Sequence, residues 1–421
     1  MEKICILGLG YIGLPTAALF ANNNYKIVGV DINKNIVETV NKGIAPFDEP
    51  GLQELLQNAI DSKKLIAKTE LEYADAFIIA VPTPLNKENK MSELKYVKSA
   101  ANMIYPYLKK DNLVILESTV PPGTSEKLLV PILEKSGLKV VEDFYLAHCP
   151  ERAIPGNTIY EMIHNDRIIG GIDAKSAELA KSLYSCFVKG NFYLTNIRTA
   201  EIVKLMENTF RDINIALANE FAQIAEECGV NIWEAIELAN KHPRVNILKP
   251  GPGVGGHCIA IDPWFLTENS TRGRIISLSR EINDGMPMHV LRITKRLLKD
   301  VHKPTITVFG VAYKGDVDDT RETPALKFVK LVEKEGYNIK IYDPHVKKFE
   351  YEILSLEDAV ENSDCIVLIT DHSEFKEIVP EDISGLMRTK NIVDTRNILD
   401  RNLWKKAGFN IKIIGDGACQ I

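Results

Sequence analysis

The sequence predicts an α/β protein with two parallel-sheet domains joined by a long central helix and a helical linker. Two observations lead to this fold class. Short buried-strand patterns alternate with helical patterns near both ends of the 421-residue chain. Between them, residues 199–228 contain neither glycine nor proline and carry apolar residues at helical spacing. We therefore expect three domains, at residues 1–198, 199–300 and 301–421.

The first domain opens with a strand, a glycine turn, a helix and a second strand, in KICILGLGYIGLPTAALFANNNYKIVGVD. This order is typical of a βαβ unit. Residues 77–84 (FIIAVPTP) and 113–119 (LVILEST) have the composition of further buried strands, each followed by a polar or proline turn. The segment up to about residue 195 is thus predicted to be a parallel α/β domain.

The middle section is predicted to be helical as far as about residue 300. Its first helix is expected to end at Gly229, and NIWEAIELANK forms another. The strand, loop, helix and strand pattern returns at residues 305–346, and residues 365–370 (CIVLIT) and 391–397 (NIVDTRN) supply more strands. These patterns predict the second α/β domain.

Composition limits the partners and the compartment. The net charge of −6 argues against a general nucleic-acid binder. The odd number of cysteines, 5, 149, 186, 228, 258, 365 and 419, and the lack of a CxxC pair favour reduced thiols in the cytoplasm. No signal peptide, long apolar run or metal-ligand spacing is apparent, so we expect neither a membrane partner nor a bound metal.

The glycine turn GLGYIG has the spacing GxGxxG, follows a strand and opens a helix. Its second glycine permits close approach of a pyrophosphate, and the helix N-terminus favours the negative charge. Asp31 ends the next strand, where a carboxylate bonds ribose hydroxyls and repels a 2′-phosphate, which favours NAD over NADP. A tight turn with a surface aspartate is the alternative. The cofactor-binding candidates here are Gly8, Gly10, Tyr11, Ile12, Gly13 and Asp31.

Polar residues on the long helix form a second candidate site. Lys204, Asn208 and Arg211 share one helix face and can present an amine, an amide and a guanidinium to an anionic ligand. A solvated polar stripe is the alternative. The loops EST (117–119) and HCPERAIPG (148–156) follow candidate strands, where ligands gather in α/β sheets, although turn chemistry alone also explains such residues.

One cysteine lies in an unusual setting. Cys258 belongs to GPGVGGHCIAIDPWF (251–265), with Asp262 four residues later. A reacting cysteine needs room for a substrate to approach the backbone, and glycines provide that room. A small core residue is the alternative.

Taken in order, GLGYIGLP, VPTP, ESTVPPGT, the Lys204/Asn208 helix, GVGGHCIAIDPWF and YKGDVDDTRETPA resemble the nucleotide-sugar 6-dehydrogenases, which include UDP-glucose dehydrogenase. The resemblance covers essentially the whole chain. The UDP-glucose branch typically has serine before the cysteine and Pro-Lys before the aspartate, whereas this chain has His257 and Ile259–Ile261. The form GHCIAIDPWF is similar to the branch that oxidises UDP-N-acetyl-D-mannosamine, whose close relatives act on UDP-N-acetylglucosamine.

The resemblance implies an N-terminal NAD-binding Rossmann domain, a helical homodimerisation domain and a C-terminal Rossmann-like domain that binds the UDP-sugar. It also implies a four-electron oxidation of a sugar CH₂OH to a carboxylate with two NAD⁺. Cys258 would form a thiohemiacetal and then a thioester. The implied catalytic set is Cys258, Lys204, Asn208, Asp262, Thr119 and Glu151.

The resemblance also assigns binding residues. The implied NAD contacts, besides the glycine loop, are Thr83, Thr119 and Arg321. The implied substrate contacts are Arg152, Ala153, Lys204, Asn208, Arg211, His242, Arg244, Gly255, Tyr313 and Lys314, with Arg244 reaching across the dimer. Three alternatives stay open: a UDP-N-acetylglucosamine or UDP-glucose dehydrogenase, a two-electron hydroxy-acid dehydrogenase that would not need Cys258, and an NAD-sensing binding protein.

Overall fold

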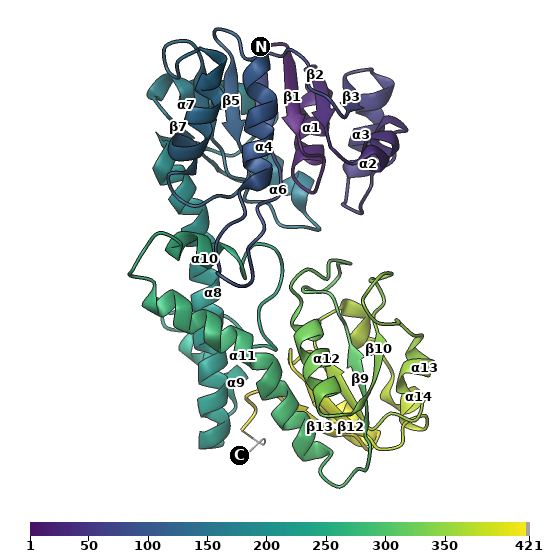
Figure 1. Cartoon of the computed structure of the whole chain (residues 1–421). Helices are drawn as coiled ribbons and strands as arrows, with labels where there is room; N and C mark the ends of the chain where they lie inside the picture. The colour runs from purple at the N-terminus through teal and green to yellow at the C-terminus, as the bar shows by residue number, and fades with distance from the viewer. Residues whose placement is uncertain (418–421) are drawn as a thin grey trace. The chain divides into compact units, whose positions relative to one another are not determined.

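The computed structural model describes residues 1–417, and its elements are labelled in Figure 1. The chain divides into two compact units. The N-terminal unit comprises residues 1–207 and 264–270, and the C-terminal unit comprises residues 208–263 and 271 onward. One sheet has eight strands and the other has five, which confirms the predicted fold class.

The eight-stranded sheet has the order β3-β2-β1-β4-β5-β6-β7-β8. Its strands are β1 (Lys3–Leu7), β2 (Lys26–Val30), β3 (Leu65–Lys68), β4 (Ala76–Ile79), β5 (Leu113–Leu116), β6 (Tyr145–His148), β7 (Arg167–Gly171) and β8 (Phe192–Asn196). The order 3-2-1-4-5-6 is that of a dinucleotide-binding sheet, in which ligands bind beyond the carboxyl ends of the strands where β1 and β4 meet.

One strand pair departs from the predicted parallel arrangement. β6 and β7 are antiparallel, with His148 opposite Gly170. For β7 to run antiparallel to β6, the chain must enter β7 at the same edge of the sheet at which it leaves β6. The connection 149–166, with α6 (Thr158–His164), therefore stays at the carboxyl side of β6. This places the loop that carries Glu151 and Arg152 at the ligand-binding edge of the sheet.

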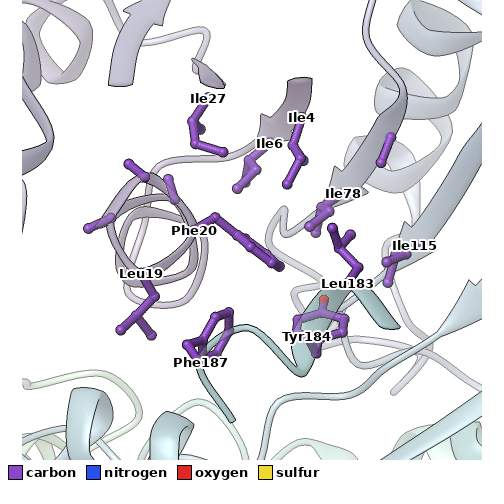
Figure 2. Close-up of a cluster of buried hydrophobic side chains, with 14 of the residues drawn as sticks. Ile4, Ile6, Leu19, Phe20, Ile27, Ile78, Ile115, Leu183, Tyr184 and Phe187 are labelled. Carbon is purple, nitrogen blue, oxygen red and sulfur yellow. The ribbon is translucent and has the colours of Figure 1, made fainter. Parts of the chain in front are cut away.

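Alternate residues of β1 face two separate cores, as the two-residue period of a strand requires. Ile4 and Ile6 pack with α1 (Gly13–Asn22), whose Phe20 lies among them in Figure 2. The Phe20 ring centroid is 5.5 Å from Tyr184 and 5.0 Å from Phe187. A fully buried phenylalanine contributes about 1.5–3 kcal/mol, so Phe20, near the C-terminal end of α1, helps to hold this helix against the sheet.

The other helices of the N-terminal unit are short. They are α2 (Lys34–Asn41), α3 (Leu52–Asp61), α4 (Lys95–Ile104), α5 (Val130–Leu133) and α7 (Ala174–Tyr184), with single turns η1 (Tyr105–Tyr107), η2 (Ser125–Leu129) and η3 (Glu134–Ser136). Residues of α4 and α5 pack with Cys5 and Leu7 of β1 in the second core.

The predicted long helix is α8 (Ile197–Cys228), which spans 32 residues and is followed by Gly229 at φ +69°. Its first eleven residues belong to the N-terminal unit and the rest to the C-terminal unit. Three more helices follow: α9 (Ile232–Ala239), α10 (Asp262–Thr267) and α11 (Arg274–Leu297). Buried Arg280 of α11 donates to Asp212 of α8 at 2.6 Å, which ties these two helices together.

The five-stranded sheet is parallel throughout and has the order β10-β9-β11-β12-β13. Its strands are β9 (Thr305–Phe309), β10 (Asn338–Tyr342), β11 (Cys365–Leu368), β12 (Asn391–Asp394) and β13 (Asn410–Ile413). Its helices are α12 (Pro324–Lys334), α13 (Leu356–Val360), α14 (Pro380–Ser384) and α15 (Arg401–Lys406), with the turn η4 (Ser373–Lys376). From β9 the chain adds β10 on one side of the sheet and then crosses back to add β11 on the other side. Ligands bind beyond the carboxyl ends of the strands at such a switch point, which here lies between β9 and β11.

Within the described residues, every helix is too short or too polar to span a lipid bilayer.

Candidate active site

The three glycines of the β1–α1 turn have different surroundings. Gly8 adopts φ +95°, and a Cβ there would lie 2.5 Å from the Ala80 carbonyl oxygen. A Cβ on Gly13 would lie 1.9 Å from the Gly8 carbonyl oxygen. At Gly10, by contrast, no described atom lies within 4 Å of the added Cβ. The turn therefore leaves open space at Gly10, at the N-terminus of α1, which fits a pyrophosphate lying against the backbone.

Asp31 directly follows β2 and braces this turn. Its Oδ2 accepts a hydrogen bond from the Leu9 N–H at 2.9 Å, and its Oδ1 accepts one from the Asn33 N–H at 2.8 Å. The side chain is partly exposed, and each carboxylate oxygen can accept more than one hydrogen bond. Its position and chemistry therefore fit the predicted contact with ribose hydroxyls. Thr83 is buried beyond the end of β4. The Tyr11 ring packs against the Phe47 ring in a tilted arrangement, with the ring centroids 4.3 Å apart.

Glu117, at the end of β5, is a buried carboxyl group to which the sequence assigned no role. It is 2% exposed and accepts hydrogen bonds from the Tyr184 hydroxyl at 2.6 Å and the Thr16 hydroxyl at 3.3 Å. Burial raises the pKa of Glu117 to about 7, although the nearby Arg167 charge acts in the opposite direction. An acidic residue directly after an apolar strand was the only sequence signal for it. Thr119, two residues later, is partly buried.

Glu151 organises the loop after β6. Its Oε1 accepts the N–H groups of Arg152 and Ala153 at 2.7 and 2.9 Å, and its Oε2 pairs with buried Arg167 at 2.8 Å. Burial alone would lower the pKa of Arg167, but the Glu151 charge raises it above its usual range. The Arg152 guanidinium pairs with Glu207 at 2.7 Å, so this predicted substrate contact has a carboxylate partner within its own unit.

The predicted polar face of α8 is largely buried. Lys204 is 6% exposed and Asn208 is fully buried, so a solvated stripe does not describe these two residues. The Asn208 side-chain amide donates to the Asp262 carboxylate, and Arg211 donates to the Asn208 carbonyl oxygen. The structure thus brings together Asn208, Arg211 and Asp262 within the C-terminal unit.

The glycines of the Cys258 loop lie close to other parts of the C-terminal unit. A Cβ added to Gly251 would meet Arg396 at 2.8 Å, and one added to Gly253 would meet the Asn283 carbonyl oxygen at 3.0 Å. At Gly255 and Gly256, the Tyr313 side chain would be 2.9 and 2.8 Å away. The interpretation that these glycines also leave room for a ligand against the backbone stays a prediction. They let the loop pack tightly against other parts of the C-terminal unit.

Cys258 itself is exposed, which excludes the alternative of a core cysteine. Its carbonyl oxygen accepts the Asp262 N–H at 2.9 Å, so the aspartate that bonds Asn208 also closes the turn after the thiol. All six cysteines within residues 1–417 are free thiols, and Cys419 lies outside the described residues. Burial raises the pKa of Cys365, Cys149 and Cys5, whereas Cys258 and Cys228 are the exposed thiols of this set.

The remaining predicted residues lie in the C-terminal unit. Arg321 donates twice to Asp319, at 2.9 and 2.6 Å, so its predicted NAD contact stays a prediction. Tyr313 follows β9 and is partly buried, and Lys314 next to it is exposed. His242 and Arg244 are exposed after α9.

A cluster that sequence spacing missed joins Asp316, His345, His372 and Glu374, whose candidate ligand atoms lie within 4.8 Å of one another. His372 is fully buried; its Nδ1 accepts the Asp316 N–H at 3.0 Å, and its Nε2 lies 3.1 Å from Asp343. Both ring nitrogens are thus engaged, and this arrangement leaves none for a metal ion.

Three family models match the chain. The NAD-binding, central and UDP-binding domains of the UDP-glucose/GDP-mannose dehydrogenase family match residues 2–188, 198–285 and 307–401. The chain belongs to the UDP-glucose/GDP-mannose dehydrogenase family. As a member, it contains an NAD-binding domain around the Gly10 turn and a UDP-binding domain around Tyr313.

Relatives within the family are similar over their full length. The UDP-N-acetyl-D-mannosamine dehydrogenase of Methanococcus vannielii is 53% identical, with 99% of this chain and 98% of that protein covered. The solved structure of the Pyrococcus horikoshii UDP-D-ManNAc dehydrogenase has a TM-score of 0.94 and 45% identity, with 99% and 100% coverage. That of the Staphylococcus aureus UDP-N-acetyl-mannosamine dehydrogenase has a TM-score of 0.89 and 42% identity, with 99% and 98% coverage.

Proposed function

We propose that this chain is an NAD-dependent UDP-N-acetyl-D-mannosamine 6-dehydrogenase, which oxidises the C6 hydroxymethyl group to a carboxylate and reduces two NAD⁺. The product is UDP-N-acetyl-D-mannosaminuronate. The observation that carries the proposal is the exposed Cys258 thiol, held in a turn that Asp262 closes and ties to buried Asn208. Full-length similarity to UDP-N-acetyl-D-mannosamine dehydrogenases supports the choice of sugar.

When bound, NAD⁺ accepts a hydride in each oxidation. The chain's own part is to bind and orient it. The backbone at Gly10 and the N-terminus of α1 hold the pyrophosphate, and Asp31 accepts hydrogen bonds from the ribose hydroxyls. Thr83, Thr119 and Arg321 supply the other contacts that we propose.

Cys258 supplies the covalent step that separates the two oxidations. Its thiolate adds to the carbon of the intermediate aldehyde, forming a C–S bond, and the carbonyl oxygen takes up a proton to give a thiohemiacetal. The second oxidation converts this adduct to a thioester. Water then attacks the thioester carbon, the C–S bond breaks, and the carboxylate and the free thiol are released.

We propose that polar side chains of α8 and of three loops stabilise the charged intermediates and bind the hydrolytic water. Lys204 and Asn208 donate hydrogen bonds to the substrate oxygen as it becomes negatively charged. Asp262, Thr119 and Glu151 hold the hydrolytic water.

Cations must bind the UDP-sugar locally because the chain carries a net charge of −6. We propose that the cations are Arg152, Lys204, Arg211, Arg244 and Lys314. The other substrate contacts that we propose are Ala153, Asn208, His242, Gly255 and Tyr313. We propose three domains: an NAD-binding domain at residues 1–198, a dimerisation domain at residues 199–300 and a UDP-sugar-binding domain at residues 301–421.

We further propose that a second copy of the chain packs on α8. Phe210, Leu217 and Ile224 are 60%, 40% and 49% exposed, and seven-residue spacing places them along one face of the helix. A continuous apolar stripe of this kind is typical of a covered surface. In this homodimer Arg244 contributes to the partner's substrate site. Reduced thiols and nucleotide substrates favour the cytoplasm as the place of action.

The test is a stoichiometric assay. Purified protein is mixed with NAD⁺ and UDP-N-acetylmannosamine, UDP-N-acetylglucosamine or UDP-glucose, and NADH and product mass are followed. We expect two NADH per UDP-N-acetylmannosamine and a uronic acid product. A preference for another sugar would reassign the substrate, one NADH per turnover would favour a two-electron dehydrogenase, and binding without turnover would favour a sensor.

Variants of the exposed thiols test the covalent step. Cys258→Ser is expected to stall with an ester adduct or at most one NADH per site, because a hydroxyl ionises less readily than a thiol. Cys258→Ala should form no adduct, while Cys228→Ala, which removes the other exposed thiol, should keep normal activity. Near-normal production of uronic acid by Cys258→Ala would exclude this mechanism.

A further inference from the structure

The loop 310–316 follows β9 and carries Tyr313 and Lys314, and three neighbouring side chains hold it. Asp343, after β10, accepts the Val311 N–H at 2.7 Å. Thr370, after β11, donates to the Ala312 carbonyl oxygen at 2.6 Å. His372 accepts the Asp316 N–H at 3.0 Å. Both ends of the loop are therefore fixed to the edge of the five-stranded sheet.

His372 connects two of these attachments through one ring. Because its Nδ1 accepts a hydrogen bond from a backbone N–H, its proton lies on Nε2, which faces the Asp343 carboxylate at 3.1 Å. Both side chains are buried. Asp343 follows β10, the second strand of its domain, just as Asp31 follows β2 in the N-terminal sheet. Asp31, however, is partly exposed. At Asp343 the imidazole shares the Oδ2 atom with the Val311 N–H.

Tyr313 connects loop 310–316 to residues 251–258, the loop that carries the Cys258 thiol. A Cβ on Gly255 or Gly256 would lie 2.9 or 2.8 Å from the Tyr313 side chain, so the tyrosine packs directly on the loop backbone. The Gly256 N–H donates to the Arg321 carbonyl oxygen at 2.9 Å, and the Tyr313 N–H donates to that of Asp319 at the same distance. Burial, followed by the charges of Asp319 and Cys258, raises the pKa of Tyr313 to about 12.

We infer that His372 is a positioning residue for the nucleophile: it fixes loop 310–316, whose Tyr313 sets the backbone of Gly255 and Gly256 and thereby the place of Cys258. This inference rests on the proposed role of Cys258. His372 takes no part in the chemistry, since it is fully buried and both its nitrogens are engaged within the protein.

The first experiment replaces His372 by phenylalanine, which keeps a ring and loses both hydrogen bonds. We expect kcat to fall about 10- to 100-fold, the range that a small displacement of a reacting group produces, at unchanged KM for NAD⁺. His345→Phe is the matched control. Its ring stacks on His372 at 4.8 Å and pairs with Glu374, and it should leave kcat within about twofold of the unmodified protein. An unchanged kcat in His372→Phe would overturn the inference.

The second experiment measures the rate at which iodoacetamide alkylates Cys258 in a Cys228→Ala background, where each modified thiol is identified by peptide mass. We expect His372→Phe to change this rate at least severalfold, and to add little in a Tyr313→Ala background because both changes act through the same contact. Additive effects would refute the pathway through Tyr313. His372→Asn keeps an acceptor for the Asp316 N–H, so its alkylation rate should lie between those of the unmodified protein and His372→Phe. This variant replaces His372→Phe in the experiment if His372→Phe does not fold.

The alkylation rate also separates this inference from the proposed function. If Cys258→Ala still makes the uronic acid, the proposed mechanism fails, yet the dependence of Cys258 alkylation on His372 and Tyr313 still decides the positioning role. If the mechanism holds and the alkylation rate ignores His372, only the inference fails.

Discussion

Replacement of Glu117 by glutamine should change the pH dependence of stability in a defined direction. Glu117 is 2% exposed, and burial raises its pKa from 4.5 to about 7. Between these two values the folded protein keeps a proton that the unfolded chain has released. Stability from this group is therefore fully present below pH 4.5 and is lost as the pH rises through 7.

The size of the effect follows from the shift. A difference of 2.5 between the two pKa values corresponds to about 3 kcal/mol at roughly 1.4 kcal/mol per unit. Glutamine imitates the protonated acid: its carbonyl oxygen accepts from the Tyr184 hydroxyl, and its amide donates to the Thr16 hydroxyl. Glu117→Gln should thus exceed the stability of the unmodified protein by less than about 1 kcal/mol near pH 5 and by up to about 3 kcal/mol at pH 8.

Urea unfolding monitored by circular dichroism at several values between pH 5 and pH 8 measures this difference. Glu178→Gln on α7 is the control, because the Glu178 side chain is 62% exposed and its replacement should give one small offset at every pH. An advantage of Glu117→Gln that is equal at pH 5 and pH 8 would refute the reasoning, since only a titrating group makes the difference depend on pH.

Three further predictions concern the cofactor and the assembly. The protein should use NAD⁺ better than NADP⁺, and Asp31→Ala should reduce that preference in kcat/KM, because the carboxylate repels a 2′-phosphate; a preference of the unmodified protein for NADP⁺ would contradict the role of Asp31. Phe210→Glu should give monomers by light scattering, because Phe210 is 60% exposed on the proposed dimer face, while Glu178→Gln on α7, whose side chain is 62% exposed, should leave the dimer intact. Mixtures of Arg244→Ala and Cys258→Ala should regain part of the activity as heterodimers, and no recovery after verified subunit exchange would argue against a shared site.

The sequence by itself determined the features that depend on local periodicity. The short apolar run ICIL and the absence of glycine and proline from residues 199–228 predicted a strand and a single helix, because each depends on near neighbours in the sequence. The spacing of Gly8, Gly10 and Gly13 likewise predicted the cofactor turn. At Cys258, local sequence raised the question of reactivity and left two answers open.

Only the tertiary structure decided which distant residues meet. Asn208 bonds Asp262 across 54 positions. Tyr313, more than 50 residues away from Gly255 and Gly256, is one of the groups that leave no space for a Cβ at these two glycines. The direction of β7, and the burial that shifts the pKa of Glu117, also depend on chain segments that come together only on folding. Periodicity reports which face of an element is apolar, whereas pairing, exposure and protonation are set by the element that packs against that face.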